Sequence, residues 1–208
     1  MGELKAVIFD CDGVMFESRR ANLAYYNQIL AQFSYPAVLP DQVERAHLCH
    51  TASSPVVLKT LLGEENLTAA LTFASELDYR EFIPFMEQEP QLIDILKCLE
   101  MRFPLAVATN RGYSIKAILA HFDLVDFFST VVTCHDVAAP KPAPDMLLLA
   151  AEQLEVPPAD CLFVGDSILD RQAADRAGMA FVGYGEAQPG ELNITSHLEL
   201  LNHLSLDQ

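Results

Sequence analysis

Two aspartates separated by a single residue, Asp10 and Asp12, directly follow the short apolar run Ala6–Phe9. The run contains β-branched residues, which indicates a strand buried on both faces. Carboxylates beside such a strand are costly unless a cation or hydrogen bonds compensate them, and two neighbouring carboxylates also repel each other. We therefore expect a metal ion between Asp10 and Asp12. Gly13 allows the chain to turn sharply directly afterwards.

Polar side chains also follow three later apolar runs. These are Thr109 and Asn110 after residues 105–108, Lys141 downstream of residues 130–133, and Asp166 and Asp170 after residues 161–164. In a parallel sheet the carboxyl ends of the strands open onto one crevice, where ligands bind. The side chains are therefore expected to form one site.

This set of groups suits the transfer of a phosphoryl group to a carboxylate and then to water. A carboxylate nucleophile divides the reaction into two steps through an aspartyl-phosphate, and a second carboxylate can protonate the leaving oxygen and later activate water. A hard divalent cation, most naturally Mg²⁺, offsets the carboxylate charges and holds a phosphoryl oxygen. A lysine, a threonine hydroxyl and backbone N–H groups can neutralise the remaining oxygens.

The same residues resemble the four ordered motifs of the haloacid dehalogenase superfamily. The motifs are Asp10-Cys11-Asp12-Gly13-Val14, Thr109-Asn110, Lys141-Pro142 and Gly165-Asp166-Ser167-x-x-Asp170. The resemblance covers essentially the whole chain. A helical stretch after the first motif resembles the cap of the phosphoglycolate phosphatase and β-phosphoglucomutase branch.

The resemblance implies a role for each motif residue. Asp10 is then the nucleophile and a magnesium ligand, and Asp12 is the general acid/base, with its backbone carbonyl on the metal. Thr109 and Asn110 then hold the phosphoryl group, and Lys141 bridges that group to Asp10. Asp166 completes the magnesium site, and Asp170 orients the loop of Asp166 or a ligand water.

Three details bear on the type of reaction and on the cap hinge. Family members that cleave carbon–halogen bonds lack an acid at the second motif position, so Asp12 favours phosphoryl chemistry. Arg111 stands where a small residue or lysine is more usual, and two interpretations stay open for it: a surface or salt-bridging residue, or a contact to substrate. Glu17-Ser18 replaces the more frequent Asp-Ser at the expected cap hinge.

The elements that must position these residues follow an alternating pattern. Apolar runs at residues 6–9, 105–108, 130–133, 161–164 and 179–182 alternate with stretches of helical spacing at 91–101, 113–122, 144–154 and 169–177. This pattern predicts an α/β fold with a Rossmann-like parallel sheet and helices on both faces. We expect residues 1–16 and 90–208 to form this catalytic core domain.

Residues 17–89 interrupt the alternation. They contain helical patterns at 20–33, 41–49, 55–62 and 68–86 and no convincing strand. We interpret them as an inserted α-helical cap domain, and the alternative is that these helices simply pack on the sheet.

Composition excludes several other classes of function. The 208 residues carry a formal net charge of −16, which opposes binding to nucleic acid or to an anionic membrane. The five cysteines are scattered and suggest neither disulfides nor a zinc site. No apolar segment approaches the length of a membrane span or a signal peptide, so we expect a cytoplasmic protein. The sequence makes no prediction about oligomeric state.

The leading hypothesis is a Mg²⁺-dependent phosphatase, a phosphoric monoester hydrolase, acting on a small phosphorylated metabolite. A β-phosphoglucomutase-like phosphomutase would use the same Asp10 and Asp12, and a non-catalytic metabolite-binding relative is a third alternative. A phosphoacceptor signalling domain is disfavoured, because such a domain needs only about half the length of this chain and no helical insert.

Two other groups of residues are not expected to be functional sites. His47, Cys49 and His50 fit no zinc spacing, and His135-Asp136 is interpreted as a loop-capping or solvated pair.

Overall fold

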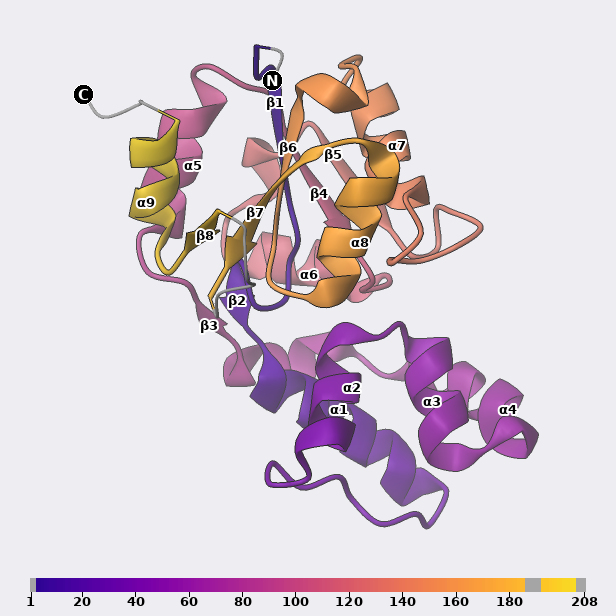
Figure 1. The fold of residues 1–208 in the computed structure, drawn as a ribbon. Coiled ribbons are helices and arrows are strands. Elements are labelled where there is room, and N and C mark those ends of the chain that lie inside the picture. Colours follow the sequence, from indigo (N-terminus) through magenta and orange to yellow (C-terminus); the bar gives the residue numbers. More distant parts are fainter. Residues whose placement is uncertain (1–2, 186–191, 205–208) are drawn as a thin grey trace. The chain divides into compact units, whose positions relative to one another are not determined.

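The computed structural model describes residues 3–185 and 192–204 and shows a chain divided into two compact units (Figure 1). One unit consists of Met1–Phe16 and Gln88–Gln208, and the other of Glu17–Glu87. The stretch of helical patterns in the sequence, residues 17–89, begins and ends close to the boundaries of the second unit.

The first unit is built on a six-stranded parallel sheet with the order β5-β4-β1-β6-β7-β8. The strands are β1 Ala6–Phe9, β4 Leu105–Thr109, β5 Thr130–Thr133, β6 Cys161–Gly165, β7 Ala180–Tyr184 and β8 Asn193–Ile194. Each predicted apolar run forms a strand, and the predicted α/β parallel sheet is confirmed. The two-residue β8 was not predicted, because it is too short to produce a pattern.

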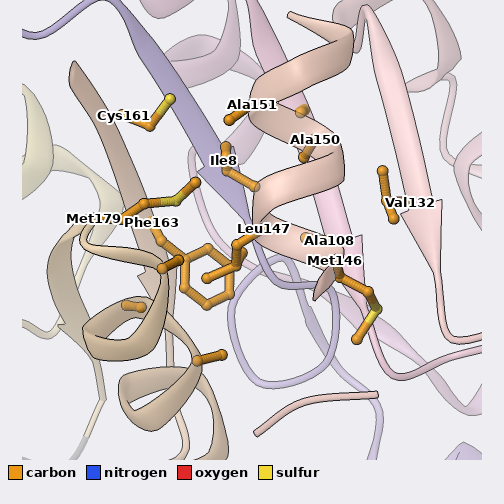
Figure 2. Close-up of a cluster of buried hydrophobic side chains, with 14 of the residues drawn as sticks. Ile8, Ala108, Val132, Met146, Leu147, Ala150, Ala151, Cys161, Phe163 and Met179 are labelled. Atoms are coloured by element: carbon orange, nitrogen blue, oxygen red, sulfur yellow. The ribbon is translucent and has the colours of Figure 1, made fainter. Parts of the chain in front are cut away.

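Alternate residues of β1 point to opposite faces of the sheet. Ala6 and Ile8 belong to a buried cluster with α7 (Asp145–Gln153) and α8 (Ile168–Ala177), which cover one face (Figure 1). Figure 2 shows the labelled side chains of this cluster, with α7 and the strands contributing to one apolar layer.

Helices also cover the opposite face of the sheet, and Phe9 points towards it. The Phe9 ring makes edge-to-face contacts with Phe128 and with His197, at centroid distances of 6.5 and 6.3 Å. His197 begins α9 (His197–His203), which lies beside α5 (Leu92–Glu100) in Figure 1. The predicted cover of helices on both faces of the sheet is therefore confirmed.

The second unit is helical. It contains α1 Arg19–Gln32, α2 Val43–Thr51, α3 Ser54–Leu62 and α4 Glu64–Glu76, followed by two 3₁₀ turns, Tyr79–Glu81 and Ile83–Phe85. It has an apolar core of its own that includes Ile29, Leu30 and Leu58. The chain enters and leaves this unit through β2 (Phe16–Glu17) and β3 (Glu87–Gln88), which form a two-stranded sheet.

The predicted helix at residues 68–86 is wrong over its second half. The helix α4 begins earlier, after Gly63, and ends at Glu76, because Leu77 adopts an extended conformation. The side chain of Asp78 then accepts a hydrogen bond from the backbone N–H of Arg80 and starts a separate 3₁₀ turn. Apolar spacing continues through this segment, but a local cap interrupts the helix.

Among residues 3–185 and 192–204, no helix combines the length and the apolar character that crossing a bilayer requires.

The adjacent leucines of α7 provide a test of the core. Leu147 is fully buried in the cluster of Figure 2, whereas Leu148 is 40% exposed. We expect Leu147→Ala to lower the free energy of unfolding by about 2–5 kcal/mol, because it leaves a cavity, and Leu148→Ala to cost much less. Urea unfolding of both variants measures the difference, and equal losses would contradict the assignment of the core.

Candidate active site

The predicted site residues come from four consecutive strands of the sheet. In the strand order β5-β4-β1-β6, Lys141 follows β5, Thr109 ends β4, Asp10 follows β1 and Asp166 follows β6. All lie at the carboxyl ends of parallel strands. The sheet therefore brings together residues that are more than 150 positions apart in the sequence.

Lys141 is at the centre of this group, and only 2% of its side chain is exposed. Its Nζ lies 2.8 Å from Asp10 Oδ1 and 2.6 Å from Asp170 Oδ1, and it donates a hydrogen bond of 3.1 Å to the carbonyl oxygen of Ala108. Burial by itself would lower the pKa of Lys141, but Asp10 and Asp170 more than offset this and hold the pKa above its ordinary value. The buried ammonium is therefore charged and paired with two carboxylates.

Asp10 is buried, and this burial raises the pKa of its carboxyl group to about 7. Lys141 opposes the effect, while Asp170 and Asp12 add to it by charge repulsion. The pKa of Asp166 is raised to about 8, first by burial and then by Asp170 and Asp10. The site thus holds more negative charge than Lys141 alone neutralises.

Carboxylate oxygens of Asp10, Asp166 and Asp170 lie within 4.8 Å of one another, close enough to hold a metal ion. The oxygens of Asp170 already have partners, however. Oδ1 pairs with Lys141, and Oδ2 accepts hydrogen bonds from the backbone N–H and the hydroxyl of Ser167, as part of a capping box at the start of α8. Asp10 and Asp166 are consequently the better candidates for ligands, and Asp170 orients Lys141 and the loop that carries Asp166.

Gly13 allows the first and fourth motifs to approach each other closely. Its φ is +76°, and a Cβ atom at this position would lie 2.0 Å from Oδ2 of Asp166. Any side chain would therefore displace Asp166 and strain the backbone.

Asn110 fixes the backbone of Lys141. Its Oδ1 accepts a hydrogen bond of 2.8 Å from the Lys141 N–H, and its Nδ2 donates one of 3.1 Å to the Lys141 carbonyl. The side chain of Asn110 thus joins the loops after β4 and β5. The hydroxyl oxygen of the neighbouring Thr109 accepts a hydrogen bond of 3.1 Å from the Arg111 N–H.

Asp12 forms a two-point ion pair with Arg111. Arg111 Nε donates to Asp12 Oδ2 over 3.0 Å, and the second donor of the fork, an Nη atom, contacts Asp12 Oδ1. The pair is largely buried, with 6% of the Arg111 side chain and 13% of the Asp12 side chain exposed. Of the two interpretations of Arg111 from the sequence, the structure therefore shows the salt bridge.

Comparison with known proteins gives the family. A family model described as haloacid dehalogenase-like hydrolase matches residues 7–184. The chain belongs to this family. The match includes the four motifs and the helical unit.

Individual relatives agree with the predicted branch. A phosphoglycolate phosphatase from Rhodobacter capsulatus is 33% identical, over 87% of this chain and 84% of that protein. A β-phosphoglucomutase from Bacillus subtilis (strain 168) is 31% identical, over 89% and 85%. A solved HAD-superfamily hydrolase of subfamily IA from Geobacter sulfurreducens PCA is 37% identical, with a TM-score of 0.84 over 96% of this chain and 99% of that one. The predicted superfamily and branch are confirmed.

Other residues considered in the sequence lie in different surroundings. His135 stacks on Tyr113 at a centroid distance of 4.4 Å, and Asp136 accepts hydrogen bonds from the backbone N–H and hydroxyl of Thr133, which is a loop cap. In the helical unit, His50 Nδ1 lies 3.4 Å from Asn22 Nδ2. Within the described part of the chain, neither histidine belongs to a grouping of side chains able to hold a metal ion.

Sequence reasoning missed His197, which contacts the loop after β1. His197 is fully buried, and its Nε2 lies 2.7 Å from the carbonyl oxygen of Val14. Because a carbonyl can only accept, Nε2 must carry the proton. The ring also stacks on Tyr184, whose hydroxyl donates to Glu89. The sequence did not predict the short helix α9, so nothing in the sequence indicated that His197 contacts Val14.

His197 predicts a pH dependence of stability. Burial lowers its pKa from 6.5 to about 4. Between these values the unfolded chain binds a proton that the folded protein does not, so stability is lost as the pH falls from about 6.5 to about 4. At about 1.4 kcal/mol per pH unit, the loss approaches about 3 kcal/mol.

We expect His197→Asn to remove this part of the pH dependence, and His203→Asn, at an exposed histidine of the same helix, to keep it. Chemical unfolding of the three proteins between pH 4 and 7.5 measures the effect. Parallel stability profiles for wild type and His197→Asn would show that His197 is not the group responsible.

Proposed function

We propose that this protein is a Mg²⁺-dependent phosphatase that hydrolyses a small phosphorylated metabolite through an aspartyl-phosphate on Asp10. The observation that carries the proposal is the buried Lys141, paired with Asp10 and Asp170 beside Asp166 at the carboxyl ends of the strands. The named relatives make phosphoglycolate the first substrate to test.

Asp10 is the nucleophile in this proposal. Lys141 holds the Asp10 carboxylate and supplies a positive charge where a phosphoryl oxygen must approach. An oxygen of Asp10 attacks phosphorus, and Asp12 gives a proton to the leaving oxygen. In the second step Asp12 takes a proton from water, which attacks phosphorus and releases phosphate from Asp10.

The phosphoryl oxygens have donors at the end of β4 and on the loop after β5. We assign the Thr109 hydroxyl and Lys141 Nζ to this role. Asn110 was also predicted to bind phosphate, but both polar atoms of its side chain contact the Lys141 backbone. We therefore propose that Asn110 contributes its backbone N–H to the phosphoryl group and uses its side chain to position Lys141.

The carboxylate cluster fits a hard divalent cation. Burial and mutual repulsion raise the pKa of both Asp10 and Asp166, and a cation would relieve this repulsion. Asp10, Asp166 and the Asp12 carbonyl would hold the ion, which by our proposal is Mg²⁺. When bound, Mg²⁺ offsets the negative charge of the phosphoryl oxygens.

We propose that the helical unit Glu17–Glu87 acts as the cap. A cap that closes over the substrate excludes bulk water and admits the acceptor of the phosphoryl group. A phosphomutase is the second candidate, since the β-phosphoglucomutase relative covers most of the chain. It would use the same Asp10 and Asp12, with a sugar hydroxyl in place of water.

The first test of this proposal concerns Asp10. Wild type is expected to release phosphate from at least one of a panel of phosphate monoesters that includes phosphoglycolate, and to lose this activity in the presence of a chelator. Asp10→Asn should reduce turnover at least about 10⁴-fold, since it removes the nucleophile. Asp126→Asn, at an exposed aspartate, is the matched control and should be fully active.

Asp10→Asn with undiminished turnover would contradict the proposal. Isomerisation of a sugar phosphate without release of phosphate would support the phosphomutase instead.

The second test of this proposal concerns the metal. Mg²⁺ at 100 times its dissociation constant should stabilise wild type by about 2.7 kcal/mol, because it binds only the folded protein. Asp166→Asn should lose most of this effect, while Asp126→Asn should retain it. Thermal unfolding with and without Mg²⁺ is the measurement, and an undiminished effect of Mg²⁺ on Asp166→Asn would remove Asp166 from the metal site.

A further inference from the structure

The ion pair between Arg111 and Asp12 goes beyond what the four motifs require. Both oxygens of Asp12 contact the guanidinium fork, and the two side chains are almost completely shielded from water. The residues lie on loops after the neighbouring strands β4 and β1. The pair thus connects the loop of the proposed acid/base to the loop of the proposed phosphate site.

Arg111 is itself anchored on the β4 side. Its backbone N–H donates to the Thr109 hydroxyl oxygen over 3.1 Å, and one terminal guanidinium nitrogen lies 3.4 Å from the hydroxyl of Ser114. Ser114 is the first residue of α6 (Ser114–His121). The guanidinium therefore has a fixed position from which it can orient another side chain.

Asp12 needs such an orienting partner. It precedes Gly13, whose backbone conformation is open to few other residues. A group that transfers a proton must be held within about 0.5 Å and 10–20° of its working geometry. A carboxylate has about four lone-pair positions, so the fork can hold both oxygens and leave one of them able to exchange a proton.

We propose that Arg111 is a positioning residue that orients the Asp12 carboxyl group for proton transfer to the leaving oxygen. The proposal rests on the phosphatase function above. In the first step Asp12 enters protonated, a bond forms between Asp10 and phosphorus, and the bond from phosphorus to the leaving oxygen breaks. The proton passes from Asp12 to that oxygen, which leaves the Asp12 carboxylate paired with Arg111. Arg111 contacts neither substrate nor phosphorus in this step.

The test compares two esters that differ in their need for this proton. An alkyl phosphate has a poor leaving group and requires protonation, whereas p-nitrophenyl phosphate has a good leaving group and requires little. The ratio kcat/KM reports the formation of the aspartyl-phosphate for each. We expect Arg111→Ala to lower kcat/KM about 100-fold for the alkyl ester, in the range for general acid catalysis, and less than about threefold for the aryl ester.

Arg111→Lys should fall between wild type and Arg111→Ala on the alkyl ester, because an ammonium keeps the charge but cannot hold both oxygens as a fork. Arg102→Ala is the matched control, since it removes an exposed arginine, and it should leave both values unchanged. Thermal unfolding of each variant checks that it is folded.

A double-mutant cycle separates an action through Asp12 from an independent one. If Arg111 acts through Asp12, Arg111→Ala should change kcat/KM for the alkyl ester less than about twofold in an Asp12→Asn background.

Equal losses for the two esters, or a full additional loss in the Asp12→Asn background, would overturn the inference and indicate that Arg111 binds the substrate directly. Failure of the proposed phosphatase function can be told apart from failure of the Arg111 inference, because wild type itself would then hydrolyse neither ester. That result would also refute the positioning role of Arg111, which rests on the phosphatase function.

Discussion

The buried ammonium of Lys141 is the interaction on which the rest of the site depends. Removing a lysine from water costs several kcal/mol, and this cost is offset only where carboxylates and further acceptors surround the charge. Asp10, Asp170 and the Ala108 carbonyl supply these partners. Loss of the Lys141 ammonium would leave both buried carboxylates without a positive partner, at a cost of about 3–5 kcal/mol. The proposed nucleophile Asp10 and the fold are therefore stabilised by the same contacts.

The surrounding structure can be understood as support for this cluster. The parallel order β5-β4-β1-β6 brings the contributing loops together, and the Asn110 side chain fixes the Lys141 backbone. The capping box of α8 directs Asp170 towards Lys141, and Gly13 leaves space for Asp166. The remaining negative charge is what makes a divalent cation the natural complement of the site.

Much of this was predictable from the sequence, for identifiable reasons. Strands buried on both faces produce continuous apolar runs, and parallel pairing places the residues that follow them at one edge of the sheet. The contacts that the site residues make with one another were not predictable. Nothing in the sequence pairs Arg111 with Asp12, directs the Asn110 side chain to Lys141, or brings His197 to Val14 from 183 positions away. The helix at 68–86 was overextended because apolar spacing does not report the local cap at Asp78.

The central claim is that Asp10 carries the phosphoryl group during turnover, and identifying the phosphorylated residue tests it most directly. Wild-type protein is mixed with a ³²P-labelled ester that it hydrolyses, quenched within one turnover, digested, and the labelled peptide is sequenced by mass spectrometry. Our account predicts a phosphoryl group on Asp10 and no labelled peptide from Asp10→Asn. A phosphoryl group on Asp12, Asp166 or any other residue would contradict it.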